Sequence, residues 1–337
     1  MQKHNSFEIP LGADPARLGS NARNAKRVSI GLPLFNAEPY LEQCLESILS
    51  QTYSNLEIII SDNASTDATE AICQRYGARD ARVRYHRNSR NRGPTFNFRQ
   101  VVAFSAGEYF LWAAHDDMFA PEYVERCVAV LEQNPDVVLC YSRSIEIGEH
   151  GQFLERQEQI LAADSPYPDR RFRELIRMDH NCETMFGVIR AVVLKRTSIH
   201  GDFPDSDRCM LAEVGLYGRF VQLPDRLFFH RRHAHQMTQQ FPSRQERMAQ
   251  LNPDRRFRIV FPHFRQFREY ILAIHRSPLG WKDRLRCYFQ MLRWLRNNAP
   301  RLVRDLRYSV VQLLRPFRLK YRQWRGSTST HFRNHSV

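Results

Sequence analysis

Two adjacent carboxylates, Asp116 and Asp117, are the residues of this sequence best suited to do chemistry. They follow the aromatic and apolar run from Tyr109 to Ala113, which has the composition of a buried strand. Two neighbouring negative charges repel each other unless a cation or strong hydrogen-bond donors hold them. Mg²⁺ is typically bound by one or two carboxylates together with substrate phosphates, and α/β sheets bind ligands beyond the carboxyl ends of their strands. The pair therefore predicts a metal–diphosphate site, although capping of a helix that begins near Pro121 is an alternative.

The segments before and after this pair alternate between strand-like and helix-like patterns. We expect strands over residues 28–32, 56–61, 83–86, 109–113 and 137–141, separated by helices over residues 38–50, 68–76, 95–105 and 121–133. This alternation predicts parallel strands joined by crossover helices, and therefore an α/β fold. No GxGxxG sequence follows the first strand, which argues against a nicotinamide-dependent enzyme.

The second half of the chain is less regular. Residues 142–180 are polar and predict a long loop of the kind that forms lids or substrate-binding segments. A helix over residues 207–217 and short strands over residues 220–223 and 227–229 follow, and the cluster HRRHAH comes directly after them.

Composition excludes several classes of protein. The seven cysteines include no CxxC pair, so we expect free thiols, a reducing compartment and no structural zinc. Residues 1–26 are polar and predict a flexible leader rather than a signal peptide. No stretch approaches 18 uninterrupted apolar residues, so a membrane-spanning helix is not expected.

Positive charge is concentrated at the end of the chain. Residues 255–337 carry 20 Lys and Arg but 3 Asp and Glu, whereas residues 1–254 carry 30 and 33. Basic residues alternate there with aromatic and aliphatic ones. The apolar residues at helical spacing are Trp281, Leu285, Tyr288, Phe289, Leu292, Trp294 and Leu295. A basic amphipathic helix of this composition is typical of membrane-surface elements. Nucleic-acid binding and a helix packed on the rest of the protein are the alternatives.

Six motifs in this order and spacing resemble the family 2 glycosyltransferases, which are inverting enzymes with the GT-A fold. They are VSIGLPLFN (28–36), SQTYSNLEIIISDNASTD (50–67), NRG (91–93), AGEYFLWAAHDD (106–117), SDRCMLAEVGLYGRF (206–220) and RRHAHQMT (231–238). The resemblance covers residues 27–240. It implies an α/β nucleotide-diphospho-sugar transferase fold with a mixed, mostly parallel central sheet, to which the C-terminal residues add a helical extension.

The resemblance also implies a nucleoside site near the first two strands. Asp62 matches the acidic residue that reads the nucleobase, and a carboxylate suits the ring N–H of a uracil-type base. Pro33, Phe35 and Asn36 match the loop that packs against the nucleoside, where Phe35 would stack on the base. The alternatives are a turn residue for Asp62 and a core residue for Phe35.

For the metal–diphosphate site, Asp117 matches the residue that ligates a divalent metal, Mg²⁺ or Mn²⁺. Asp116 would contact the ribose, or the metal through water. His115 stands where the family's motif often has Asp, but the last two carboxylates are kept. His233 matches a position that reaches the metal and diphosphate, with surface exposure as its alternative.

Cationic and acid–base roles follow in the same way. Arg231 and Arg232 would clamp the departing diphosphate, for which bidentate arginine is well suited. Asp207 matches the general base that deprotonates the acceptor hydroxyl, and capping of the 207–217 helix is its alternative or additional role. Asp205 is the rival base, and Glu213 matches the helix pattern in a structural role.

Together these features predict an inverting glycosyltransferase that moves a sugar from a UDP- or dTDP-type donor to a hydroxyl group. We expect a catalytic domain over residues 27–240, a basic helical extension over residues 241–325 and a disordered tail over residues 326–337. The expected partners are the nucleotide-sugar donor, a glycan or lipid-linked acceptor and an anionic membrane surface, and no nucleic acid is expected. The expected location is the cytoplasm, on the inner face of the cell membrane, in envelope polysaccharide or glycolipid synthesis. The rival hypothesis is a non-catalytic nucleotide-fold protein that uses its basic tail for binding.

Overall fold

The structure is a computed structural model that describes residues 25–154, 161–177, 182–240, 247, 251 and 261–331. For residues 237, 238 and 308–331 it describes the backbone alone. The expected leader over residues 1–26 lies almost wholly outside the described residues, as do residues 332–337 of the expected tail. No helix in the described part of the chain is both long and apolar enough to cross a membrane.

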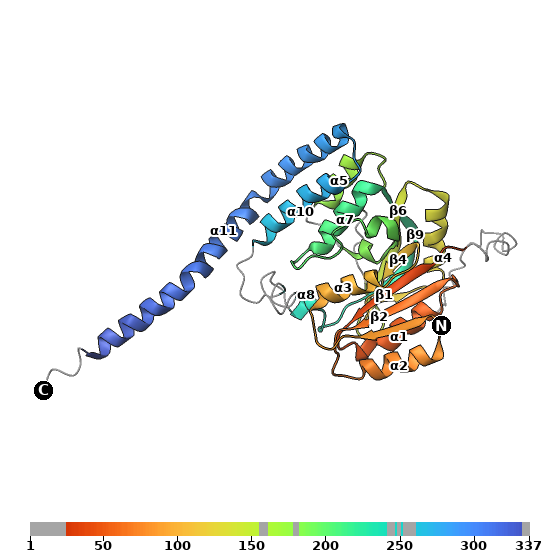
Figure 1. The fold of residues 1–337 in the computed structure, drawn as a ribbon, viewed down its shortest axis with the longest axis horizontal. Helices are drawn as coiled ribbons and strands as arrows, with labels where there is room; N and C mark the ends of the chain where they lie inside the picture. Colours follow the sequence, from red (N-terminus) through yellow and green to blue (C-terminus); the bar gives the residue numbers. More distant parts are fainter. Residues whose placement is uncertain are drawn as a thin grey trace, which may run out of the picture.

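A single mixed sheet forms the centre of the fold (Figure 1). Its strands are β1 (Val28–Leu34), β2 (Leu56–Asp62), β3 (Val83–Arg87), β4 (Tyr109–Trp112), β5 (Met118–Phe119), β6 (Val137–Ile147), β7 (Phe153–Leu154), β8 (Val188–Arg190) and β9 (Arg219–Arg231). The spatial order is β3-β2-β1-β4-β8-β6-β9-β5, with β7 paired to β6. The long pairings among β1, β2, β3 and β4, and between β6 and β9, are parallel, whereas β5, β7 and β8 pair antiparallel. The expected mixed, mostly parallel sheet is confirmed.

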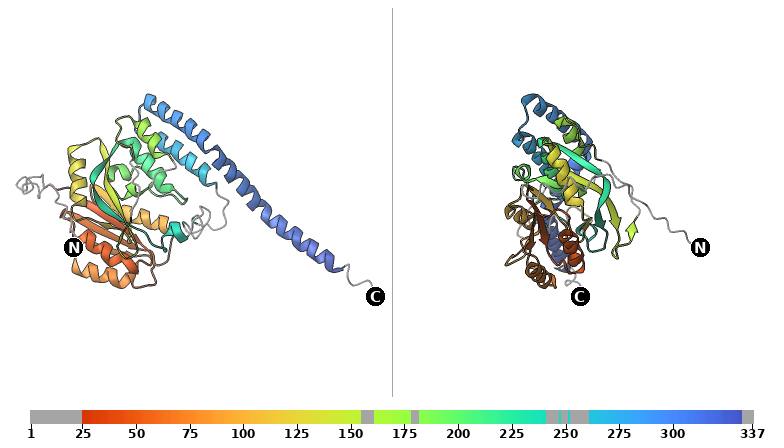
Figure 2. Two further views of the ribbon diagram at one scale, coloured as in Figure 1. Left: turned by 180° about the vertical axis from the view of Figure 1, so that it is seen from behind. Right: turned by 90° about the vertical axis from the view of Figure 1, so that its right-hand side faces the viewer.

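Helices cover both faces of this sheet (Figures 1 and 2). One layer contains α1 (Glu38–Leu49), α2 (Thr69–Arg79) and α4 (Tyr123–Gln133). The other contains α3 (Pro94–Ala103), α5 (Pro168–Leu175), α6 (Ala191–Leu194), α7 (Ser206–Tyr217), α10 (Pro262–Arg276) and the first part of α11 (Trp281–His331). Two short elements, η2 (Glu183–Phe186) and α8 (Met237–Gln240), complete the set. Each expected helix of the first half is present to within a few residues.

Residues 142–180 differ from the expected irregular loop. β6 continues to Ile147, β7 pairs with its end, and α5 follows. β9 is likewise one continuous strand rather than two short ones. The physical reason is that β6 and β9 pair along almost their whole length and absorb register shifts near Ser142 and Arg143. Such shifts are β-bulges, which sequence periodicity does not reveal.

The C-terminal helices pack on the rest of the protein, which was one of the alternatives for this region. Tyr270 and Ile274 of α10, and Cys287, Met291 and Trp294 of α11, are buried in the same cluster as α5 and α7. Trp294 therefore does not lie on an exposed apolar face as its spacing suggested. α11 runs without a break to His331, past the expected start of the tail, and its far part projects from the body in Figure 1 and in the left view of Figure 2.

A buried ion pair fastens α10 to α7. The Arg276 guanidinium donates to both carboxylate oxygens of Glu213, at 2.7 and 3.0 Å, and Ser198 also donates to this carboxylate. The Glu213 side chain is 1% exposed and that of Arg276 is 35% exposed. Glu213 thus has the structural role that its place in the helix pattern indicated.

We expect Glu213→Ala to lower the free energy of unfolding by about 3 kcal/mol, because it leaves a half-buried guanidinium without its carboxylate. The measurement is chemical denaturation followed by circular dichroism. The matched control is Glu42→Ala, which breaks an exposed pair with Arg75 and should cost less than about 1 kcal/mol. Equal losses in the two variants would contradict this assignment.

Candidate active site

The turn after β4 places Asp116 and Asp117 at the carboxyl edge of the sheet. Asp117 is buried, and its Oδ1 accepts a hydrogen bond of 2.9 Å from the backbone N–H of Arg231. His230 Nδ1 lies 3.1 Å from the same oxygen. Asp116 Oδ2 lies 2.9 Å from His233 Nε2. The end of β9 and the residues after it therefore close over the acidic turn, so the HRRHAH cluster and the carboxylate pair form one site.

The two carboxylates have opposite pKa shifts. Burial raises the pKa of Asp117 to about 6, helped by the negative charge of Asp116 and opposed by His230. Burial alone would also raise the pKa of Asp116, but the hydrogen bond from His233 and the nearby His115 lower it to about 2. Burial lowers the pKa of His230, yet its contact with Asp117 outweighs this, and the net shift is upward. The two adjacent carboxylates therefore differ in environment, and a bound cation would favour the ionised form of both.

The donor set fits a divalent cation whose coordination is completed by a diphosphate. If Nε2 of His233 donates its proton to Asp116, the ring nitrogen Nδ1 carries a lone pair. Nδ1 is buried and has no hydrogen-bond partner among the described residues. The residues that the structure describes contain no ready-made cluster of three or more His, Cys, Asp or Glu for a metal. A magnesium-type site that shares its ion with substrate phosphates does not need one. Asp117 and His233 as ligands stay predictions.

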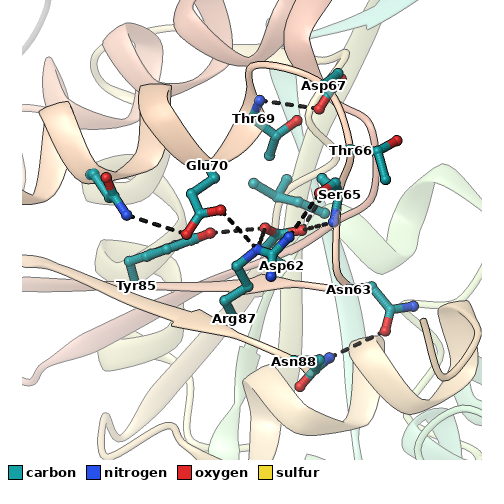
Figure 3. Close-up of polar contacts among 12 residues, drawn as sticks. Asp62, Asn63, Ser65, Thr66, Asp67, Thr69, Glu70, Tyr85, Arg87 and Asn88 are labelled. Carbon is teal, nitrogen blue, oxygen red and sulfur yellow. Dashed lines mark hydrogen bonds and ion pairs between the residues drawn. The ribbon is translucent and has the colours of Figure 1, made fainter. Parts of the chain in front are cut away.

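The predicted base-reading residue, Asp62, ends β2 with both carboxylate oxygens engaged (Figure 3). Oδ1 accepts hydrogen bonds from the Ser65 backbone N–H and hydroxyl, at 2.9 and 2.6 Å. Oδ2 accepts one from the Tyr85 hydroxyl at 2.8 Å and lies 3.4 Å from Arg87 Nε. Asp62 is fully buried. These hydrogen bonds show that Asp62 stabilises the conformation of the loop over residues 63–67. Contact of Asp62 with a nucleobase stays a prediction.

The loop after β1 is joined to the same segment. The backbone N–H of Asn36 donates to Ser65 Oγ, and Asn36 Oδ1 accepts from the Thr66 N–H, both at 2.9 Å. Asn36 has a positive φ of 49°, which asparagine tolerates. Pro33 is half-buried within β1, whereas Phe35 is 45% exposed. The core alternative for Phe35 is therefore wrong, and its ring is available to stack on a ligand.

Asp207 lies in the first turn of α7. Its Oδ1 accepts a hydrogen bond of 2.8 Å from the Arg208 backbone N–H. The capping position belongs to Asp205, which has a left-handed φ of 63° and makes no side-chain capping bond. The proposed base is therefore within the helix, and its rival is at the cap. Asp207 as the general base stays a prediction.

Comparison with known proteins agrees with this arrangement. The family described as Glycosyl transferase family 2 matches residues 29–196. An uncharacterized glycosyltransferase of Haemophilus influenzae is 27% identical over 238 residues, which are 67% of this chain and 72% of that protein. The chain belongs to glycosyltransferase family 2. These findings give no support to the rival hypothesis of a non-catalytic protein.

Other relatives of this chain match over shorter stretches. An uncharacterized glycosyltransferase of Rickettsia typhi is 32% identical over 135 residues, 39% of this chain and 41% of that protein. An uncharacterized protein of Mycobacterium tuberculosis matches over 57% of its length. The chain thus spans well under two thirds of these two relatives. The crystal structure of S. aureus TarS 1–349 with UDP-GlcNAc aligns with a TM-score of 0.58 and 15% identity, covering 86% of this chain and 81% of that one. The GT-A fold is confirmed.

The side chain of Arg231 makes its contacts within the protein. It is buried, and its guanidinium lies 4.7 Å from the Tyr40 ring centroid. Its donors reach the backbone carbonyls of Asp116, Gly148 and Glu149 and the side-chain oxygen of Gln43, at 2.6–3.3 Å. Arg231 therefore stabilises the acidic turn through hydrogen bonds to the backbone. Arg232 donates through Nε and Nη2 to Glu146 Oε1, at 2.8 and 2.5 Å. A diphosphate clamp by either arginine stays a prediction.

We expect Arg231→Lys to lower the free energy of unfolding by about 2–4 kcal/mol in the absence of a nucleotide sugar. An ammonium group cannot replace the guanidinium fork, so buried carbonyls lose their partners. The measurement is denaturation of the free enzyme. The control is Arg232→Lys. The ion pair of Arg232 with Glu146 is partly exposed, so this change should lower the free energy of unfolding by less than about 1 kcal/mol. An Arg231→Lys enzyme of unchanged stability that binds donor poorly would instead indicate a clamp.

Sequence reasoning missed two residues that organise the site. Asn63 Nδ2 donates to Asn91 Oδ1 at 2.9 Å and to the Gly93 carbonyl at 3.1 Å. Asn63 Oδ1 accepts from the Asn88 side chain and the Arg92 N–H, at 3.2 and 3.0 Å. Asn63 thus fixes the NRG segment against the β2 loop. The NRG motif was visible in the sequence, but nothing in the sequence indicated that Asn63 is its partner.

The second missed residue is His200, which contacts both the β4 region and the start of α7. Its ring lies 4.7 Å from Phe98 and 5.8 Å from Trp112 at the end of β4, between ring centroids. Its Nδ1 is 3.2 Å from Ser206 Oγ, one residue before Asp207. Burial lowers the pKa of His200 to about 4, so the imidazole is neutral near neutral pH. A single histidine outside any cluster gave no signal in the sequence.

Proposed function

We propose that this glycosyltransferase moves a sugar from a nucleoside-diphosphate donor to a hydroxyl acceptor with inversion at the anomeric carbon. The observation that carries the proposal is the Asp116–Asp117 turn, held at the carboxyl edge of the sheet by His230, Arg231 and His233. A uridine- or thymidine-type donor is favoured by the match of Asp62 to the family's base-reading carboxylate, and the exposed Phe35 beside the β2 loop offers a ring for stacking. The similarly folded TarS binds UDP-GlcNAc, which supports the same choice.

In the proposed mechanism Asp117 and His233 would hold a divalent ion, Mg²⁺ or Mn²⁺, with Asp116 beside it. When bound, this ion supplies positive charge that stabilises the departing diphosphate. Asp207 takes the proton of the acceptor hydroxyl while that oxygen forms its bond to the anomeric carbon. The bond from this carbon to the diphosphate oxygen breaks on the opposite face, so the configuration inverts. Phe35 stacks on the base and fixes the donor.

We also propose that the acceptor is a glycan or lipid-linked molecule of the cell envelope, glycosylated on the cytoplasmic side of the membrane. The support is the concentration of basic residues in the C-terminal region. A lipid-linked acceptor is confined to the membrane surface, so an enzyme held there meets it at a higher local concentration.

The test is a thermal-shift screen of nucleotide sugars with Mn²⁺, followed by donor hydrolysis and transfer assays on the hits. We expect a uridine or thymidine diphosphate sugar to raise Tm with Mn²⁺ and to be hydrolysed slowly without acceptor. Stabilisation by guanosine diphosphate sugars alone would overturn the donor assignment. Donor binding that never leads to hydrolysis or transfer would overturn the catalytic proposal.

A further inference from the structure

Helix α11 has two apolar faces, and only one of them meets the core. Cys287, Met291, Trp294 and Leu302 are buried against the rest of the protein. The opposite face exposes Trp281, Leu285, Phe289, Leu292, Val303 and Leu306, each with 46–72% of its surface accessible. We call these six residues the outer stripe.

The outer stripe lies on one side of the helix and consists of two groups, one over residues 281–292 and one over residues 303–306. Its members are spaced by three, four or eleven residues, the intervals that return to one side of an α-helix. From Trp281 to Leu306 the stripe extends over about 38 Å of helix. None of the residues that the structure describes covers it. Exposed apolar patches of this size mark interaction sites in soluble domains.

Basic residues line this stripe. Between residues 281 and 307 the helix carries eight Lys and Arg but two Asp. Lys282, Arg286, Arg293, Arg296, Arg304 and Arg307 are exposed. One of the two aspartates, Asp305, is buried against His263 and contributes no negative charge to the outer surface. The stripe therefore presents an apolar band with a strongly positive border.

We propose that the outer stripe docks this enzyme on an anionic lipid bilayer, with α11 lying along the membrane surface. Apolar side chains would enter the interface while arginines contact lipid phosphates, as amphipathic membrane helices do. A second copy of the chain is a poorer occupant, because pairing two such helices would bring their positive borders together. The inference rests on the proposed function in one respect, since it supplies the surface that carries the enzyme to a membrane-bound acceptor.

The experiment is co-sedimentation of the full chain with vesicles, either phosphatidylcholine alone or phosphatidylcholine mixed with phosphatidylglycerol. We expect binding to the mixed vesicles, weaker binding to the neutral ones, and partial release at high salt because screening shortens the reach of the charges. The stripe variant is Trp281→Ser/Phe289→Ser/Leu292→Ser. The border variant is Arg286→Gln/Arg293→Gln/Arg304→Gln. Each should weaken binding to mixed vesicles at least tenfold.

Matched controls remove similar groups from other surfaces. Phe153→Ser/Val192→Ser removes two exposed apolar side chains, and Arg75→Gln/Arg79→Gln/Arg126→Gln removes three exposed arginines. Both controls should bind vesicles as the parent does. All substituted residues are exposed, so an unchanged Tm confirms that the variants are folded.

Several results would overturn the proposal. Stripe and border variants that bind vesicles like the parent would show that another surface docks. A parent that is dimeric by analytical ultracentrifugation, with a monomeric stripe variant, would make a second copy the occupant. Donor hydrolysis without vesicles separates this inference from the proposed function. The stripe variant should hydrolyse donor at the parent rate, and vesicle binding without any hydrolysis would remove the catalytic proposal alone.

Discussion

Asp117→Asn is expected to abolish sugar transfer and to weaken binding of the nucleotide sugar in the presence of Mg²⁺ or Mn²⁺. The variant removes a buried negative charge that would hold the cation against the diphosphate. Metal stabilisation of a departing phosphate contributes several kcal/mol, so kcat/KM should fall on the order of 10³-fold or more. The measurement is steady-state transfer, with donor affinity from calorimetry at fixed metal concentration.

The shape of the site should survive this substitution. An asparagine oxygen can still accept the N–H of Arg231, which Asp117 accepts at 2.9 Å. Excess chelator acting on the parent enzyme should reproduce the loss. Asp136→Asn is the matched control, because Asp136 is a mostly exposed carboxylate that pairs with Arg219. Full activity of the parent in excess chelator would refute the metal-dependent mechanism.

Asp207→Asn should leave donor affinity nearly unchanged but lower kcat by about 10²–10⁴-fold. The amide cannot accept the proton of the acceptor hydroxyl, and general-base catalysis typically contributes a factor of this size. A loss confined to kcat indicates an interaction made in the transition state alone. The measurement is transfer rate against pH, together with donor binding by calorimetry.

Asp205→Asn is the control for the same helix end. Asparagine accepts the left-handed backbone of Asp205, so this variant should fold and retain transfer activity. The assignment fails if Asp205→Asn loses activity and Asp207→Asn keeps it. Loss of donor binding in Asp207→Asn would also contradict a role limited to the base.

The donor half of the fold could be predicted because its signals are local. β1, β2 and β4 are apolar runs bounded by turn residues, and Phe35, Asn36, Asp62 and Asp116 lie at or after the end of one of them. The structure extends both strands beyond the expected residues 28–32 and 56–61 and places Leu34 opposite Asp62. The acidic turn was predictable for the same reason, since two carboxylates after a buried strand need partners.

What could not be predicted depends on tertiary pairing. β9 continues through His230 and Arg231 because β6 runs beside it to Ile147, and the cluster therefore reaches Asp117. The sequence identified arginines but not that Arg231 faces backbone carbonyls. Helical spacing likewise indicated an apolar face over residues 281–295, yet packing decides that Trp294 is buried and Phe289 is exposed.

The ion pair between Glu213 and Arg276 has a consequence for building chimeric enzymes. It ties α7, which begins beside Asp207, to α10, and α10 packs against α11. A chimera designed to accept a new acceptor should therefore receive α7, α10 and α11 from one parent. A junction placed between α7 and α10 would separate the two charges and pair each with an unrelated surface. The segment from β1 to β4 has no share in this pair, but β4 pairs with β8 and α3 packs in the same core as α7, so a junction after β4 would need a matched β8 and α7 as well.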